Sequence, residues 1–235
     1  DRGGSGTATG TTSWSIPTIA LQLGANVITV TATDSAGATA SDTLTVTYAP
    51  LPTMGLDKTA LIFGAVSDGS AFSARTSAQA VRLTQSGTGT VTWTAASSVP
   101  WLTVSPSSGT GPATLNVSVQ FASGLAVTQG GNITLTFSGA ANTPGPIAVT
   151  LNTAAASAAA SPQGSFDTPL EGATGVTGSI PVTGWAVDDI EVTRVRIFRD
   201  AVAGEGSGLV FIGDAVFVDG ARPDVQATFP ALPRS

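Results

Sequence analysis

A period of two between apolar and polar residues dominates this chain and limits it to β structure. In residues 26–33, Ile28 and Val30 share one face, and threonines occupy most of the other. After an expected turn at Asp34–Gly37, the alternation resumes in residues 42–48. β-Branched Thr and Val side chains fit a pleated, half-buried surface, and no helical period of comparable quality is found in the sequence. The pattern predicts an all-β chain with a hairpin at this place.

The central part of the chain, residues 50–153, carries enough alternating segments for a complete β-sandwich. Clusters of Gly, Ser and Pro separate the segments and predict turns between them. The expected strands lie at 59–66, 78–85, 90–96, 101–105, 113–121, 131–138 and 146–153. Short strands at this spacing, in about 100 residues, are typical of an immunoglobulin-like (Ig-like) sandwich. We therefore predict an all-β fold of tandem Ig-like sandwiches, the central one complete and the outer two partial.

The outer parts, residues 1–49 and 164–235, hold fewer strand-like segments. The first predicts strands at 19–23, 26–33 and 42–48, and the second at 179–187, 192–199, 209–218 and 224–229. Sheets this small leave their edges unpaired and bury little core. We therefore interpret the first part as the C-terminal part of one sandwich and the last part as the N-terminal part of another.

Two changes in composition separate the three parts. The segment Ala49-Pro50-Leu51-Pro52 contains two prolines, which stiffen the path of the chain. Residues 154–163 are rich in Ala and Ser, and they are too few for a stable isolated helix, so a flexible linker is expected there. Ten of the 15 acidic residues follow residue 163, so charge also distinguishes the last part.

Composition excludes several classes of function. The chain has no Cys and no His, which excludes disulfides, Cys/His zinc sites and Ser-His or Cys-His nucleophile pairs. A net charge of −6 argues against nucleic-acid binding, because that function needs a basic surface. No apolar run approaches the ~18 to 20 residues of a membrane helix, so no membrane span is expected.

Short phrases in each part resemble known extracellular modules. Residues Leu21–Gly37 resemble the C-terminal half of bacterial Ig-like and PKD-type repeats. The central part resembles a BACON domain, named as a Bacteroidetes-associated, often N-terminal, carbohydrate-binding module. The segments that resemble this domain are Val91–Ala95, Pro100–Gly111 and Thr114–Val119. The last part is similar to Ig-like repeats of large bacterial exported proteins, through Phe166–Pro169, Gly184–Asp189 and Arg222–Val225.

These resemblances imply tandem modules outside the cell, secreted or on the cell surface. Such modules serve as spacers, adhesive segments or appendages of polysaccharide-acting enzymes, and their partners are neighbouring domains of the same chain or a glycan. The resemblance assigns no ligand residue.

Trp101 is the candidate for contact with a glycan. An exposed aromatic ring can stack on the apolar face of a sugar. Leu102 and Val104 occupy the inward face, so alternation puts Trp101 on the other face or at the end of the sandwich after Pro100. Packing in the core or at its edge is nevertheless the favoured interpretation of Trp101, because sandwiches commonly anchor on a Trp. Core positions are also expected for the other three tryptophans, Trp14, Trp93 and Trp185.

Asp188, Asp189 and Glu191 are the candidate ligands of a metal ion. They place three carboxylates close together at an expected turn, and calcium prefers six to eight oxygen ligands. The regular spacing of a calcium-binding loop is missing, so a solvated acidic turn is the alternative. No other cofactor is expected.

Catalysis is not expected from this chain. Glycoside hydrolysis needs two carboxylates, and the central part offers only Asp57 and Asp68, neither at a well-defined strand end. The leading hypothesis is a non-catalytic spacer segment of a large secreted or cell-surface bacterial protein. The second hypothesis is a carbohydrate-binding or adhesive module attached to a polysaccharide-acting enzyme or an adhesin.

Overall fold

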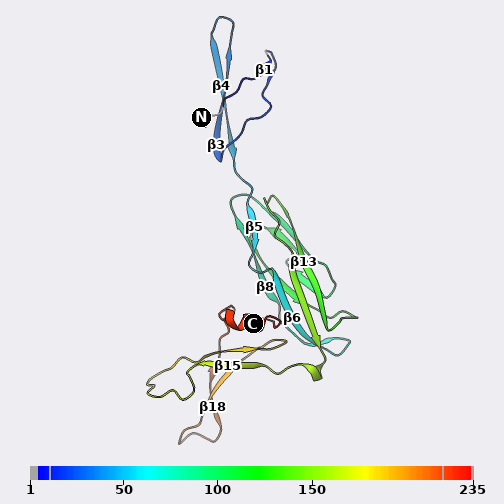
Figure 1. The fold of residues 1–235 in the computed structure, drawn as a ribbon, viewed down its shortest axis with the longest axis vertical. Helices are drawn as coiled ribbons and strands as arrows, with labels where there is room; N and C mark the ends of the chain where they lie inside the picture. Colours follow the sequence, from blue (N-terminus) through cyan, green and yellow to red (C-terminus); the bar gives the residue numbers. More distant parts are fainter. Residues whose placement is uncertain (1–4, 11, 219, 234–235) are drawn as a thin grey trace.

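Strands make up nearly all regular elements of the computed structural model, in which residues 5–10, 12–218 and 220–233 are described. Figure 1 shows three parts in a row along the long axis: a hairpin, a sandwich and a third part that contains the C-terminus. The prediction of an all-β chain is confirmed. Neither described helix combines the length and the apolar character that crossing a membrane requires.

Two sheets form the central sandwich. One has the strand order β10-β12-β8-β5 and the other the order β11-β9-β13-β14-β6-β7. The strands are β5 (Thr53–Leu56), β6 (Ala60–Ser67), β7 (Phe72–Arg75), β8 (Gln79–Ser86), β9 (Thr92–Ser97), β10 (Leu102–Ser105), β11 (Ser108–Thr110), β12 (Ala113–Val119), β13 (Thr128–Ser138) and β14 (Ile147–Ala154). β14 and β6 pair in parallel, whereas the other pairs in these sheets are antiparallel.

All seven strands expected in the central part are present, as β6, β8, β9, β10, β12, β13 and β14. The sequence pattern missed β5, β7 and β11, which have four, four and three residues. Each of these three lies at the edge of its sheet. Alternation is a weak signal over so few residues, which explains the omission.

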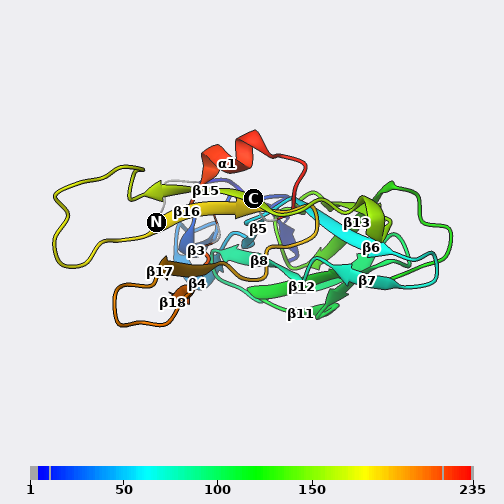
Figure 2. The ribbon, with the colours of Figure 1, turned by 90° about the horizontal axis from the view of Figure 1, so that it is seen from below.

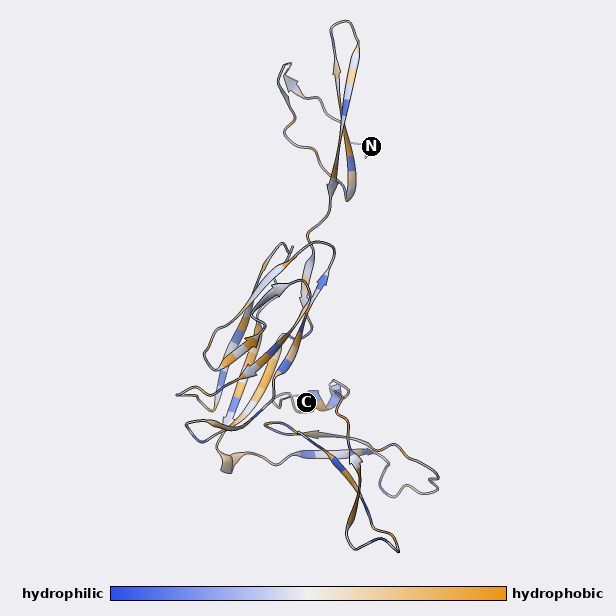
Figure 3. Cartoon of the chain, turned by 180° about the vertical axis from the view of Figure 1, so that it is seen from behind, coloured by the Kyte–Doolittle hydropathy of each residue, from blue (hydrophilic) through white to orange (hydrophobic). Residues whose placement is uncertain are grey.

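The core of the sandwich follows the alternation of its strands. Nineteen buried residues form one hydrophobic cluster between the two sheets, and Phe63, Leu115, Ile133 and Leu151 in it are fully buried. Figure 3 shows the corresponding hydrophobic stretches on the sandwich strands. Trp93 belongs to this core, as predicted. Such a cluster supplies the main favourable free energy of folding for this part.

The first part is built around a long hairpin. β3 (Gly24–Thr33) and β4 (Thr39–Tyr48) pair over ten positions, which confirms the predicted hairpin. The side chain of Asp34 accepts hydrogen bonds from the backbone N–H groups of Ala36 and Ala38, both at 2.9 Å, and Gly37 has φ +86°. Asp and Gly therefore make the turn in the expected way.

Two expectations for the first part were wrong. No strand forms at residues 19–23, and two short strands, β1 (Thr9–Gly10) and β2 (Trp14–Ser15), pair with each other instead. Trp14, predicted in the core, is 53% exposed, because in the described part of the chain β2 pairs only with the two-residue β1.

The third part consists of two separate two-stranded sheets and a helix. The elements are β15 (Gln163–Thr168), β16 (Thr183–Val187), β17 (Arg196–Asp200), β18 (Leu209–Asp214) and α1 (Pro223–Thr228). Figure 2 shows α1 beside β15 and β16. The predicted strand at 224–229 was wrong, because Pro223 in the first turn presets the backbone angle of a helix.

The segment between the sandwich and the third part is shorter than the predicted linker of residues 154–163. β14 continues to Ala154, a 3₁₀ turn occupies Ala156–Ala158, and β15 begins at Gln163. Residues 1–4, 11, 219 and 234–235 of the predicted outer parts lie outside the described residues.

Candidate functional site

The glycan platform expected at Trp101 is not exposed in the structure. Trp101 is 5% exposed and belongs to the core cluster together with Leu102. A ring in this position has no free face to stack on a sugar. The favoured interpretation, packing in the core, therefore describes the observed position of Trp101, and a sugar platform at this ring does not.

Local backbone geometry explains why alternation failed at Trp101. β10 begins at Leu102, and residues 100–101 form a turn, so residues 101 and 102 do not have to face opposite sides. The ring packs beside Gly131 of β13. A Cβ atom at that glycine would lie 3.1 Å from Cζ2 of Trp101 and 2.6 Å from Cγ2 of Val99. The glycine thus leaves the space that the indole occupies.

The acidic segment at 188–191 uses its carboxylates in hydrogen bonds with the protein. Oδ1 of Asp188 accepts from the N–H groups of Ile190 at 2.8 Å and Glu191 at 3.1 Å. Oδ2 of Asp189 accepts from the N–H of Ala160 at 3.2 Å. Oε2 of Glu191 accepts from both the N–H and the hydroxyl of Ser77, at 2.9 and 2.7 Å. The three carboxylates therefore face different partners.

No group of three acidic side chains arranged to hold a metal ion occurs within the described residues. Oδ1 of Asp189 is buried without a hydrogen-bond partner, whereas its other oxygen is bonded. Calcium needs several oxygens directed at one point. The calcium site stays a prediction, and the contacts show which hydrogen bonds an ion would have to replace.

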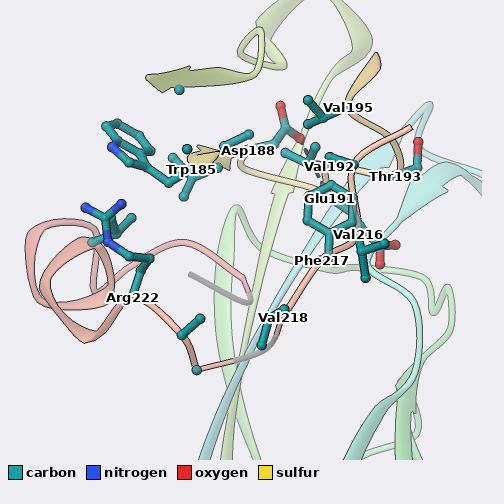
Figure 4. A pocket seen from close by; sticks show the side chains of 18 of the residues that line it. Trp185, Asp188, Glu191, Val192, Thr193, Val195, Val216, Phe217, Val218 and Arg222 are labelled. Carbon is teal, nitrogen blue, oxygen red and sulfur yellow. Dashed lines mark hydrogen bonds between the residues drawn. The ribbon is translucent and has the colours of Figure 1, made fainter. Parts of the chain in front are cut away.

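An open cavity of about 1540 Å³ lies between the sandwich and the third part. Figure 4 shows Trp185 and Arg222 on one side of it and Val192, Val216 and Phe217 on the other. Val216 is 87% exposed and Phe217 52% exposed. Alternation identified apolar residues in this region, but it could not predict that these side chains stay exposed.

A charged cluster of Arg222, Asp224 and Asp167 lies at the edge of the cavity near α1. Arg222 donates to both carboxylate oxygens of Asp224, at 2.9 and 2.7 Å, and also to Asp167 of β15. The hydrogen bonds from Arg222 lower the pKa of Asp224 to about 2 and raise the pKa of Arg222. Arg222 and Asp224 are thus paired on either side of Pro223, and the bond from Arg222 to Asp167 ties the start of α1 to β15.

Trp185, expected in the core, is partly exposed in the wall of the cavity. Its ring packs against Phe229, with ring centroids 5.6 Å apart and planes tilted by 41°. Val187, two residues further along β16, is 4% exposed and Val225 of α1 is 6% exposed. α1 and β16 therefore form a small apolar contact of their own.

No curated protein matches the chain. Among solved structures, the Bacteroides ovatus GH5 xyloglucanase in complex with a XXXG heptasaccharide is similar at 18% identity and a TM-score of 0.31. This match covers 44% of the chain and 19% of the xyloglucanase chain. The chain thus spans about a fifth of the length of that enzyme.

Two further solved structures are similar. PapD-like domain 7 of human CEP192 is 13% identical, with a TM-score of 0.35 and coverage of 47% of this chain and 92% of that chain. Domains 4–9 of the surface layer protein SbsC are 16% identical, with a TM-score of 0.30 and coverage of 79% and 30%.

A family model described as the viral BACON domain matches residues 56–152. The match begins at Leu56, the last residue of β5, and ends at Asn152 in β14. It therefore covers the sandwich apart from most of β5 and the end of β14, and it leaves out the first and third parts. The resemblance inferred from the sequence phrases of the central part is confirmed. The central sandwich of this chain is a BACON-like domain.

Proposed function

We propose that this chain is a non-catalytic spacer segment of a large secreted or cell-surface protein, with outer parts that belong to Ig-like domains. The observation that carries this proposal is the arrangement of the parts in a row (Figure 1). The chain enters the sandwich through β5 and leaves it through β14 toward the third part. A module used in this way holds its neighbours apart.

Contacts just after the proline joint support the proposal. Pro52 is buried, and its carbonyl accepts a hydrogen bond from the N–H of Ala141 at 2.8 Å. Asn142 accepts from the N–H of Met54 at 2.8 Å and donates to the Met54 carbonyl at 2.9 Å. The chain is thus fastened to the sandwich within a few residues of the joint, which limits the freedom of the connection.

The matching family is described as viral, whereas the sequence phrases resemble bacterial proteins. A spacer outside a cell has the same role for either source, because it depends on the module and its joints. A search of the parent reading frame for a neighbouring hydrolase, anchor or repeat array helps to decide between a spacer and a binding module.

Carbohydrate binding is the second candidate function, and the BACON-like domain favours it. The burial of Trp101 moves the candidate platform out of the BACON-like domain to Trp14 of the first part, which is the most exposed tryptophan, at 53%. A flat exposed ring offers the surface that a sugar needs.

A polysaccharide panel with the full chain tests both functions. The spacer proposal expects no saturable binding and an elongated particle in small-angle X-ray scattering. Saturable binding of a polysaccharide, lost in Trp14→Ala and kept in Trp101→Phe, would replace the spacer with the binding module. Circular dichroism checks that each variant keeps its strands.

A further inference from the structure

The outer face of β6 is buried although it lies outside the core of the sandwich. Leu61, Phe63 and Ala65 point into the core cluster. Successive strand residues face opposite sides, so Gly64 and Val66 point away from that core. Both are nevertheless buried, and Val66 is 8% exposed. Another segment of the chain must therefore cover this face.

Gly64 is covered by the acidic segment Asp188–Glu191 of the third part. A Cβ atom added at Gly64 would lie 1.8 Å from the carbonyl oxygen of Asp189 and 3.1 Å from Cα of Ile190. Both of these atoms belong to the backbone, so no change of side-chain rotamer can make room for a Cβ atom at position 64. The requirement for glycine at position 64 is one of space, because its lack of a Cβ lets another backbone approach closely.

Hydrogen bonds from the sandwich fasten the same segment. Thr76 is 1% exposed, and its hydroxyl donates to the carbonyl of Ile190 at 2.7 Å. That hydroxyl also accepts from the N–H of Gly64 at 2.8 Å. Ser77 donates its N–H and its hydroxyl to Glu191. Three consecutive residues of the third part, 189–191, are therefore in contact with the sandwich.

We propose that Asp188–Glu191 is a latch that fixes the angle between the BACON-like sandwich and the third part, with Gly64 as its seat. This inference rests on the proposed spacer function and deepens it. Its contacts join residues 114 positions apart in the sequence, so they act in addition to the covalent connection through residues 155–162. The sandwich and the third part then move as one body.

A distance measurement on the full chain tests the latch. The chain has no Cys, so the exposed sites Thr114 in β12 and Ser207 between β17 and β18 can both be changed to Cys and spin-labelled without competing thiols. Pulsed electron–electron resonance then measures the distance between the labels. The latch predicts one narrow distance distribution in the parent chain.

Gly64→Ala is the variant with the largest expected effect, a distribution at least twice as wide or a shifted maximum. Gly130→Ala is the matched control. It lies in β13 of the same sheet, and a Cβ atom there meets nothing within 4 Å, so the narrow distribution should persist.

Glu191→Ala supplies a second variant that leaves the sandwich sequence intact. It removes the acceptor of both Ser77 bonds and should widen the distribution less than Gly64→Ala. Near-ultraviolet circular dichroism of the buried Trp93 and Trp101 verifies the sandwich core in each variant. A broad distribution in the parent, or an unchanged one in both variants, overturns the latch. Those outcomes leave the spacer function standing, whereas polysaccharide binding overturns the spacer and leaves the latch.

Discussion

The sandwich and the third part contain the same kind of strand, yet only the sandwich closes around a core. In the sandwich, two sheets enclose nineteen buried apolar residues. In the third part, β15–β16 and β17–β18 are separate pairs, and Phe211 and Val216 are 52% and 87% exposed. Figure 3 shows hydrophobic strand segments in both. Alternation thus assigns the faces of a strand, while burial depends on a second sheet being present.

The largest expected difference between the two parts is in the free energy of unfolding lost when a Phe is changed to Ala. Phe63→Ala removes a fully buried ring and should lower the free energy of unfolding by about 3–5 kcal/mol. Phe211→Ala, at a half-exposed ring, should change it by no more than about 0.5 kcal/mol. Urea unfolding followed by circular dichroism measures both. Equal losses would mean that the third part has a closed core in solution.

Substitution of a glycine by Ala should produce a smaller difference in stability between the two parts. A Cβ atom at Gly109 would lie 2.6 Å from Cζ2 of Trp93, whereas one at Gly213 of β18 meets nothing within 4 Å. Gly109→Ala should therefore cost about 1–3 kcal/mol through overpacking, and Gly213→Ala should be nearly neutral. Thermal unfolding of the two variants checks this ordering. A neutral Gly109→Ala would show that the Trp93 ring can shift.

The third part should respond to acid through the Arg222 cluster. Hydrogen bonding from Arg222 lowers the pKa of Asp224 to about 2 in the folded chain, below the ~3.9 of an unfolded Asp. A lowered pKa means that the contribution to stability is present above the unfolded value and is lost as the pH falls through about 2. Carbon-13 NMR of the Asp224 carboxyl follows the titration. In Arg222→Gln its midpoint should rise toward ~3.9, and an unchanged midpoint would exclude Arg222 as the cause.

Calcium binding is expected to have the smallest effect on the stability of the chain. If Asp188, Asp189 and Glu191 bind the ion, the stability gain is about 0.4 kcal/mol when the free calcium concentration equals the dissociation constant. Differential scanning fluorimetry with calcium, magnesium and chelator measures the shift in Tm. A shift that Asp188→Asn abolishes supports the site. The absence of any shift up to millimolar calcium leaves the acidic segment as a structural contact.

The strands of the sandwich could be predicted because each carries several alternating residues. The short edge strands β5, β7 and β11 gave too little periodicity. Alternation alone pointed Trp101 away from the core, because the pattern does not extend into the turn before β10. The tendency of sandwiches to anchor on a Trp favoured the buried position that the structure shows. The latch had no local signal either. In the sequence, Gly64 is indistinguishable from any other strand glycine, and only the fold places Asp189 against it. The acidic segment 188–191 is typical of a solvated turn or an ion site. Contacts between distant segments depend on the fold rather than on local pattern.

The parallel pairing of β6 with β14 has a consequence for a chain under tension. Tension applied between the two neighbours of the sandwich first reaches β5 on the entry side. Once β5 has separated from β8, the tension pulls β6 from its beginning and β14 from its end. Because the strands run in the same direction, their seven paired positions, from Ala60 with Ala148 to Val66 with Ala154, are loaded together in shear and not opened one by one. Forced unfolding is governed by the unfolding rate, and shear of a whole ladder slows that rate. This strand pair therefore makes the BACON-like sandwich resist extension along the direction in which the chain passes through it.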